Sequence, residues 1–170
     1  VNAKSQTTNP GIYAIGDITP GLALAHKASY EAKVVAEAIA GHASKIDYKA
    51  MPAVCYTTPE IATTGLSLEE CLAKKISAKA TDFPLAANSR AIAASKTEGF
   101  VRIIHDEKTK LILGAQIAGL NASEIITTMT MAIETGLTLE DVALTIFPHP
   151  SVSEAIMDTM EAGLGYPIHM

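Results

Sequence analysis

The sequence predicts an α+β fold for residues 46–170, preceded by a shorter segment, residues 1–45, of a different kind. After Asp47-Tyr48-Lys49, short candidate strands alternate with several helices that have recognisable start signals. Two of the strands flank a short charged turn. Before this boundary, an apolar run without alternation leads into an alanine-rich helix. We therefore expect an antiparallel sheet with flanking helices, preceded by one strand and one helix of another domain.

The first segment has the pattern of half a βαβ unit. Residues 12–15 are apolar without alternation, which is typical of a strand buried on both faces of a parallel sheet. Residues 25–40 predict a helix that Gly41 ends, with Lys27, Glu31, Lys33 and Glu37 mostly off its apolar stripe. The stripe consists of Ala25, Ala28, Ala32, Val35, Ala36 and Ile39. One strand cannot make a parallel sheet, so we expect a remnant with an altered arrangement and with residues 12–15 exposed.

Four strands are predicted in the second segment, at residues 53–56, 78–83, 99–105 and 111–118. The last two flank the polar turn 106–110 and predict a β-hairpin.

Helix starts are marked by a capping residue followed three positions later by an acid. The four pairs are Ser67 with Glu70, Asn121 with Glu124, Thr138 with Asp141, and Ser151 with Glu154. The helix after Asn121 has apolar residues at core spacing, namely Ile125, Ile126, Met129 and Ile133. Its Met129 and Met131 could lie in the domain's own core or at a dimer contact, and the periodicity leaves both open.

The composition excludes some partners. Formal net charge is −5, with 18% charged residues, so the chain has no basic field for nucleic acid or for an anionic membrane surface. Apolar residues make up 48%, yet no apolar run approaches the roughly 20 residues that span a bilayer, and the N-terminus has no signal-peptide layout. We expect a soluble intracellular protein that binds neither nucleic acid nor a membrane.

Several catalytic motifs are absent. The chain has no G-x-G-x-x-G, Walker, H-E-x-x-H or G-x-S-x-G motif, so it is not expected to be a self-contained nucleotide-dependent or metal-dependent enzyme. Its five histidines lack metal-ligand spacing, and we predict no metal site. Cys55 and Cys71 are 16 positions apart, which fits neither a redox pair nor zinc, and favours free thiols.

The first candidate site is at Ile15-Gly16-Asp17. A carboxylate that follows a buried strand can accept hydrogen bonds from ribose-type hydroxyls, but such an Asp can equally cap its own turn. The helix that begins within residues 21–28 offers a positive dipole end that suits an electron-rich ring edge. Its alanines can also simply permit close packing, and the two interpretations are compatible.

The second candidate site is at His149, which Pro148 and Pro150 flank directly before a helix start. Glu154 lies in the first helical turn and can reach the imidazole. A carboxylate on one ring nitrogen fixes the tautomer and leaves the other nitrogen to take a proton, as in a general base. Alternatively, Glu154 is half of a capping box with Ser151, and His149 is a packed loop residue.

Together these residues resemble the pyridine-nucleotide disulfide oxidoreductases, over essentially the whole chain. Residues 9–17, Asn-Pro-Gly-Ile-Tyr-Ala-Ile-Gly-Asp, resemble the family's last flavin-binding segment, and residues 24–28, Leu-Ala-His-Lys-Ala, the stretch after it. Residues 56–65 look like the opening of its dimerisation domain. Residues 149–154 match its catalytic His-Pro-Thr/Ser-x-x-Glu motif.

The resemblance implies a remnant of an FAD-binding domain at residues 1–45 and an FAD/NAD-linked reductase dimerisation domain at residues 46–170. His149 would be the acid-base residue and Glu154 its partner, serving the other subunit of a homodimer. Asp17 would bind the ribityl chain of FAD. The backbone of four residues would contact the flavin ring, namely Ala23, Leu24, Ala25 and His26.

Within the family, the ending at residues 165–169 and Pro148-His149-Pro150 look most like the members that reoxidise dihydrolipoyl groups of 2-oxoacid dehydrogenase complexes with NAD+. The partner would then be the lipoyl domain of the acyltransferase, in the cytoplasm or, in a eukaryote, the mitochondrial matrix. FAD and NAD would bind the full-length parent, while this chain alone is expected to be inactive, cofactor-free and dimeric. The alternatives are a glutathione-reductase-like enzyme and, in isolation, a non-catalytic dimerisation module. Phe147 and Ser151 depart from the usual His and Thr.

Overall fold

The computed structural model describes residues 1–169, which form two compact units, one up to Tyr48 and the other from Lys49 onward. We call them the N-terminal unit and the sheet unit. No helix in the described part of the chain is both long enough and apolar enough to cross a membrane.

The sheet unit contains one five-stranded antiparallel sheet with strand order β1-β2-β5-β4-β3. The strands are β1 (Ala53–Cys55), β2 (Glu60–Gly65), β3 (Ala78–Pro84), β4 (Phe100–Asp106) and β5 (Ile112–Gly119). The predicted antiparallel sheet is confirmed, as are four predicted strands and the β4–β5 hairpin. Strand β2 was not predicted, because its buried residues are the small Ala62 and Thr64, whose alternation gives little hydrophobic signal.

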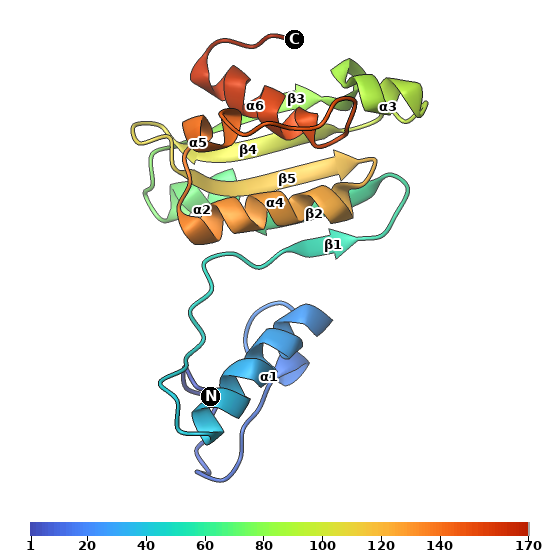
Figure 1. Ribbon diagram of the computed structural model, residues 1–170. Coiled ribbons are helices and arrows are strands. Elements are labelled where there is room, and N and C mark those ends of the chain that lie inside the picture. Colours follow the sequence, from blue (N-terminus) through green and yellow to red (C-terminus); the bar gives the residue numbers. More distant parts are fainter. Residues whose placement is uncertain (170) are drawn as a thin grey trace. The chain divides into compact units, whose positions relative to one another are not determined.

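Two helices cover one face of the sheet. Helix α4 (Ala122–Thr135) packs against β2 and β5, and α6 (Glu154–Leu164) packs against β3 and β4 (Figure 1). Beneath them, alternate residues of the hairpin are fully buried, with Val101 opposite Ile117 and Ile103 opposite Ala115. The intervening Arg102 instead forms an ion pair with Asp82 at 2.7 Å. One buried and one polar face is the expected design of an antiparallel sheet.

The two methionines of helix α4 lie in different environments. Met129 is fully buried in the core, whereas Met131 is 64% exposed. Ile126 and Ile133 also join the core, as their spacing predicts, and Ile125 packs partly buried against it.

The remaining helices are short, namely α2 (Leu68–Ala73), α3 (Ser89–Ala93) and α5 (Leu139–Ala143). The predicted capping boxes of α2 and α5 are confirmed. Asn121 does precede α4, but its backbone is left-handed (φ 58°) and its side chain makes no capping hydrogen bond, so that part of the prediction is wrong. Ser151 is not the cap of α6 either, because α6 begins at Glu154 after Ser153.

In the N-terminal unit, the predicted helix is present as α1 (Ala25–Ile39), but the predicted strand at residues 12–15 is not. Only an isolated bridge joins Tyr13 to Gln6, and Ile12 is 53% exposed. A strand needs neighbours to satisfy its backbone, and here the only paired neighbour among the described residues is the short segment 5–7, which bonds to Ile12 and Ala14. Helix α1 is also turned differently from its apolar stripe, since its buried residues are Lys27, Glu31 and Val34.

Candidate functional site

His149 and Glu154 form a direct pair at the start of α6. Nδ1 of His149 lies 2.8 Å from Oε1 of Glu154. The histidine side chain is 71% exposed and the glutamate side chain 14%. Within residues 1–169, Nε2 of His149 has no hydrogen-bond partner. An imidazole held through one nitrogen, with the other open to an approaching group, is the arrangement of a general base.

Glu154 also makes one of the two hydrogen bonds of the capping box that the sequence offered as an alternative, although Ser151 is not the N-cap of α6. Its Oε2 accepts a hydrogen bond from the backbone N–H of Ser151 at 2.7 Å, while the Ser151 hydroxyl pairs with that of Ser153. Burial alone would raise the pKa of Glu154. Hydrogen bonds from Ser151 and His149, with the nearby charges of His149 and His169, outweigh burial and lower the pKa. The carboxylate therefore stays ionised and keeps both contacts.

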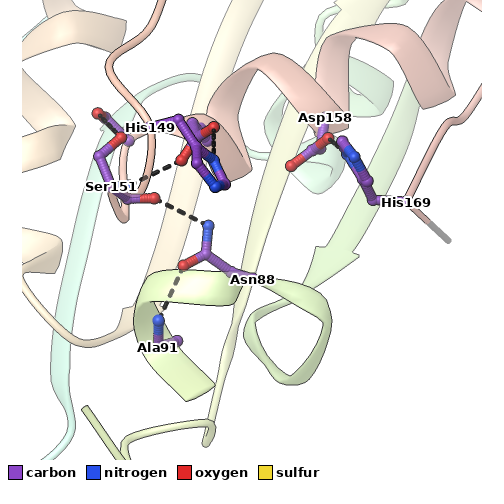
Figure 2. Close-up of polar contacts among 8 residues, drawn as sticks. Asn88, Ala91, His149, Ser151, Asp158 and His169 are labelled. Atoms are coloured by element: carbon purple, nitrogen blue, oxygen red, sulfur yellow. Dashed lines mark hydrogen bonds and ion pairs between the residues drawn. The ribbon is translucent and has the colours of Figure 1, made fainter. Parts of the chain in front are cut away.

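Asn88 secures the loop that carries His149. Its side-chain amide donates to the carbonyl oxygen of Ser151 at 3.0 Å, and its oxygen accepts from the backbone N–H of Ala91, capping α3 (Figure 2). Asn88 is only 3% exposed. This contact spans 63 positions along the chain, so no sequence pattern near His149 could have predicted it.

A second histidine–carboxylate pair, which the sequence analysis missed, lies one helical turn further along α6. Nδ1 of His169 is 2.7 Å from Oδ1 of Asp158, which is four residues after Glu154 (Figure 2). Both pairs, with Asn88, line a hollow of about 80 Å³. The hydrogen bond and charge of Asp158 raise the pKa of His169. The two residues of this pair are 11 positions apart and His169 follows the end of α6, so no helical spacing indicates the contact.

The predicted flavin contacts belong to the N-terminal unit. Asp17 is exposed, in a 3-10 turn at Gly16–Ile18 whose Gly16 packs against Ala28 of α1. Helix α1 begins at Ala25 after Leu24, which provides no side-chain cap, and Ala23 and His26 flank these two residues. An exposed carboxylate can accept hydrogen bonds from the hydroxyls of a polyol, and the positive end of a helix suits an electron-rich ring.

The cysteines and the metal-ligating side chains of residues 1–169 add no further candidate. Cys55 and Cys71 are free thiols, the first exposed and the second buried, as predicted. No group of three or more histidine, cysteine or acidic side chains among these residues could hold a metal ion.

The comparison with protein families decides the assignment. Residues 51–160 match the model of the pyridine nucleotide-disulphide oxidoreductase dimerisation domain. The chain belongs to this family. The matched range contains all five strands of the sheet unit together with His149 and Glu154.

Relatives of known name cover nearly the whole chain. It is 51% identical over 169 residues to dihydrolipoyl dehydrogenase of Staphylococcus aureus, and 49% over 170 residues to that of Geobacillus stearothermophilus. These matches cover 99% and 100% of this chain but 36% of each relative, so the chain spans about a third of their length.

Solved structures agree. LpdA from Mycobacterium tuberculosis superposes with a TM-score of 0.88 at 30% identity, covering 95% of this chain and 36% of that one. The HOCl-induced flavoprotein disulfide reductase RclA from Escherichia coli gives 0.87 at 29%, covering 95% and 38%. The family and the dimerisation-domain fold implied by the sequence are thus confirmed.

Proposed function

We propose that this chain is part of a dihydrolipoyl dehydrogenase, an FAD- and NAD-dependent oxidoreductase that reoxidises dihydrolipoyl groups of 2-oxoacid dehydrogenase complexes. In this proposal residues 46–170 supply the dimerisation domain with its catalytic pair, and residues 1–45 supply the end of the FAD-binding domain. The observation that carries it is the 2.8 Å contact of His149 with Glu154, in a chain 51% identical over 169 residues to such an enzyme.

His149 acts as the acid-base residue. Its open Nε2 accepts the proton of a dihydrolipoyl thiol, and the resulting thiolate is the form that attacks a disulfide. Glu154 holds Nδ1–H, which fixes the tautomer and stabilises the imidazolium that forms. The redox disulfide is supplied by a part of the parent protein outside these residues, since Cys55 and Cys71 do not match its pattern.

The N-terminal unit supplies contacts to FAD. The exposed Asp17 accepts hydrogen bonds from the ribityl hydroxyls, and the backbone of residues 23–26 lies against the flavin ring. Bound FAD would accept the reducing equivalents and pass them to NAD+. The chain alone binds neither cofactor and does not turn over.

The catalytic unit in this proposal is a cytoplasmic homodimer that receives the lipoyl domain of an acyltransferase, with His149 serving the active site of the other subunit. Support comes from the apolar surface beside the pair. Leu144 is 83% exposed and Ile146 is 95% exposed, directly before the Phe147-Pro148-His149 loop. A second copy of the sheet unit is the occupant that a dimerisation domain requires.

The activity is tested on the full-length protein with His149→Gln and Glu154→Gln. His149→Gln is expected to lower kcat for dihydrolipoamide oxidation by NAD+ about 10²–10⁴-fold, and Glu154→Gln to lower it less. The exposed His42→Gln is the matched control and should be unchanged. Full activity of His149→Gln would refute the catalytic assignment. If the wild type instead reduced glutathione disulfide with NADPH and ignored dihydrolipoamide, the glutathione-reductase-like alternative would hold.

Dimerisation is tested by light scattering of the 170-residue chain over a concentration series. A mass near twice 17.8 kDa is expected. Ile146→Asp should shift the equilibrium toward monomer, because a charge would replace an apolar contact at the interface. Leu72→Asp, at an exposed apolar position on α2, should not. A wild-type chain that stays monomeric at every concentration would mean that dimerisation needs other parts of the parent.

A further inference from the structure

The N-terminal unit buries an ion pair, Lys27 with Glu31, on the inner side of α1. Lys27 is 1% exposed and Glu31 is 3% exposed, on successive turns of α1. Nζ of Lys27 lies 3.2 Å from Oε1 of Glu31. Burying two charges costs several kcal/mol, and well-packed apolar residues in such positions are often at least as stabilising. The pair is therefore not explained by stability alone.

Both charged side chains contact the backbone of the same residue, Gly16, through its two flanking peptide groups. Nζ of Lys27 donates to the carbonyl oxygen of Gly16 at 2.9 Å, and Oε2 of Glu31 accepts from the backbone N–H of Gly16 at 2.6 Å. Thr19 completes the arrangement, because its hydroxyl accepts from Lys27 at 2.7 Å and lies 2.7 Å from the same Gly16 oxygen, to which it donates. The two polar backbone groups of one glycine are thus held by a lysine, a glutamate and a threonine.

Gly16 directly precedes Asp17, so fixing Gly16 fixes the direction of the next side chain. Its φ of +73° is open to glycine, and a Cβ there would lie 3.1 Å from that of Ala28. The carbonyl that Lys27 and Thr19 hold belongs to the Gly16–Asp17 peptide bond itself. Charge-assisted hydrogen bonds are short and directional, and they suit this task better than apolar packing would.

We propose that Lys27 and Glu31 are positioning residues that clamp Gly16 and so aim the exposed Asp17 carboxylate at the ribityl hydroxyls of the flavin. This inference rests on the proposed flavin-binding role of Asp17. Neither Lys27 nor Glu31 touches the cofactor, because both lie buried behind the turn. They set the geometry of the group that does.

The test uses the full-length protein and the variant Lys27→Met/Glu31→Leu, which removes both charges together and leaves no unpaired ion. We measure the Kd of FAD for the apoprotein by flavin fluorescence, the visible spectrum of the bound flavin, and the Tm of the apoprotein. FAD affinity is expected to fall about tenfold or more and the flavin spectrum to shift, with the apoprotein Tm largely kept. Lys33→Met/Glu37→Leu makes the same changes at the same spacing on the exposed side of α1 and should leave all three unchanged.

The outcomes separate the clamp from the proposed function. If the wild-type apoprotein bound no FAD, the proposed function would fail. If Asp17→Asn weakened FAD binding but Lys27→Met/Glu31→Leu bound FAD like wild type, the clamp would be refuted while the flavin site stood. A loss of affinity matched by an equal loss of apoprotein stability would also refute it, as a merely structural role.

A milder variant decides the matter if the double variant does not fold. Thr19→Val keeps the shape of the side chain but removes the hydroxyl between Lys27 and the Gly16 carbonyl. A several-fold weaker FAD affinity at unchanged Tm is expected, and unchanged affinity would overturn the proposal.

Discussion

The two units of this chain are stabilised in opposite ways. The contiguous apolar core lies entirely in the sheet unit, from Ala50 to Met160. In the N-terminal unit the deepest side chains are polar, namely Lys27, Glu31 and Ser5, while Ile18 is 82% exposed and Ile39 65%. The sheet unit is therefore held mainly by apolar packing, whereas the most deeply buried contacts of the N-terminal unit are polar.

The largest expected difference is in amide exchange of the 170-residue chain. Amides of β4 and β5 should exchange at least about 100-fold more slowly than those of residues 12–15, because the strands open only with the core while the N-terminal run opens locally. Mass spectrometry or NMR after transfer to D₂O measures this. Equal protection in both places would mean that residues 12–15 have found a partner, for which the second chain of a dimer is the first candidate.

The next effect concerns packing. Ile103→Ala removes a fully buried side chain from the core of the sheet unit and should lower its free energy of unfolding by about 2–5 kcal/mol in urea. Val34→Ala, the matched truncation in the N-terminal unit at 4% exposure, should leave the transition of the sheet unit unchanged. If Val34→Ala destabilised the sheet unit as much as Ile103→Ala does, the two units would unfold together and the contrast between them would be lost.

The same contrast explains how far the sequence could be used. In the sheet unit the sequence patterns match the local environment. The polar turn 106–110 between two candidate strands predicted the β4–β5 hairpin. The prolines beside His149 and the position of Glu154 in the first helical turn predicted that Glu154 reaches the imidazole. In the N-terminal unit the apolar pattern describes a parallel sheet that these residues do not contain, so the predicted strand at residues 12–15 is wrong.

Contacts between residues far apart in the chain could not be predicted from the sequence either. Asn88 meets Ser151 across 63 positions, and nothing near either residue announces the pairing. The Lys27–Glu31 pair has the ordinary i, i+4 spacing of a solvent-exposed helix pair, and only its burial against Gly16 distinguishes it. The sequence gives the spacing of two charged side chains, whereas the surrounding fold decides whether those side chains are exposed or buried.

The smallest expected effect is on pH dependence, where two histidines of the sheet unit should act in opposite directions. His105 is fully buried on β4; its Nδ1 lies 3.1 Å from the carbonyl oxygen of Asp106 and its Nε2 3.4 Å from the hydroxyl of Thr81. These contacts suit a neutral ring that donates through Nδ1 and accepts through Nε2. Burial, the largest influence, lowers the pKa of His105. Its contribution to stability is fully present above the unfolded pKa of about 6.5 and is lost as the pH falls from there through the lowered folded-state pKa.

For His169 the sign is reversed, because the hydrogen bond and charge of Asp158 raise its pKa. Its contribution is present below about pH 6.5 and is lost as the pH rises through the folded-state value. Urea unfolding at pH 5.5 and 7.5 measures this. The free energy of unfolding of wild type should exceed that of His105→Gln by more at pH 7.5, and that of His169→Gln by more at pH 5.5. The second change should be the weaker, since the His169 side chain is 58% exposed and solvent screens its pairing. An advantage over His105→Gln that grew on acidification would show that the ring is charged in the core, and that its contacts with Asp106 and Thr81 are not those of the neutral imidazole.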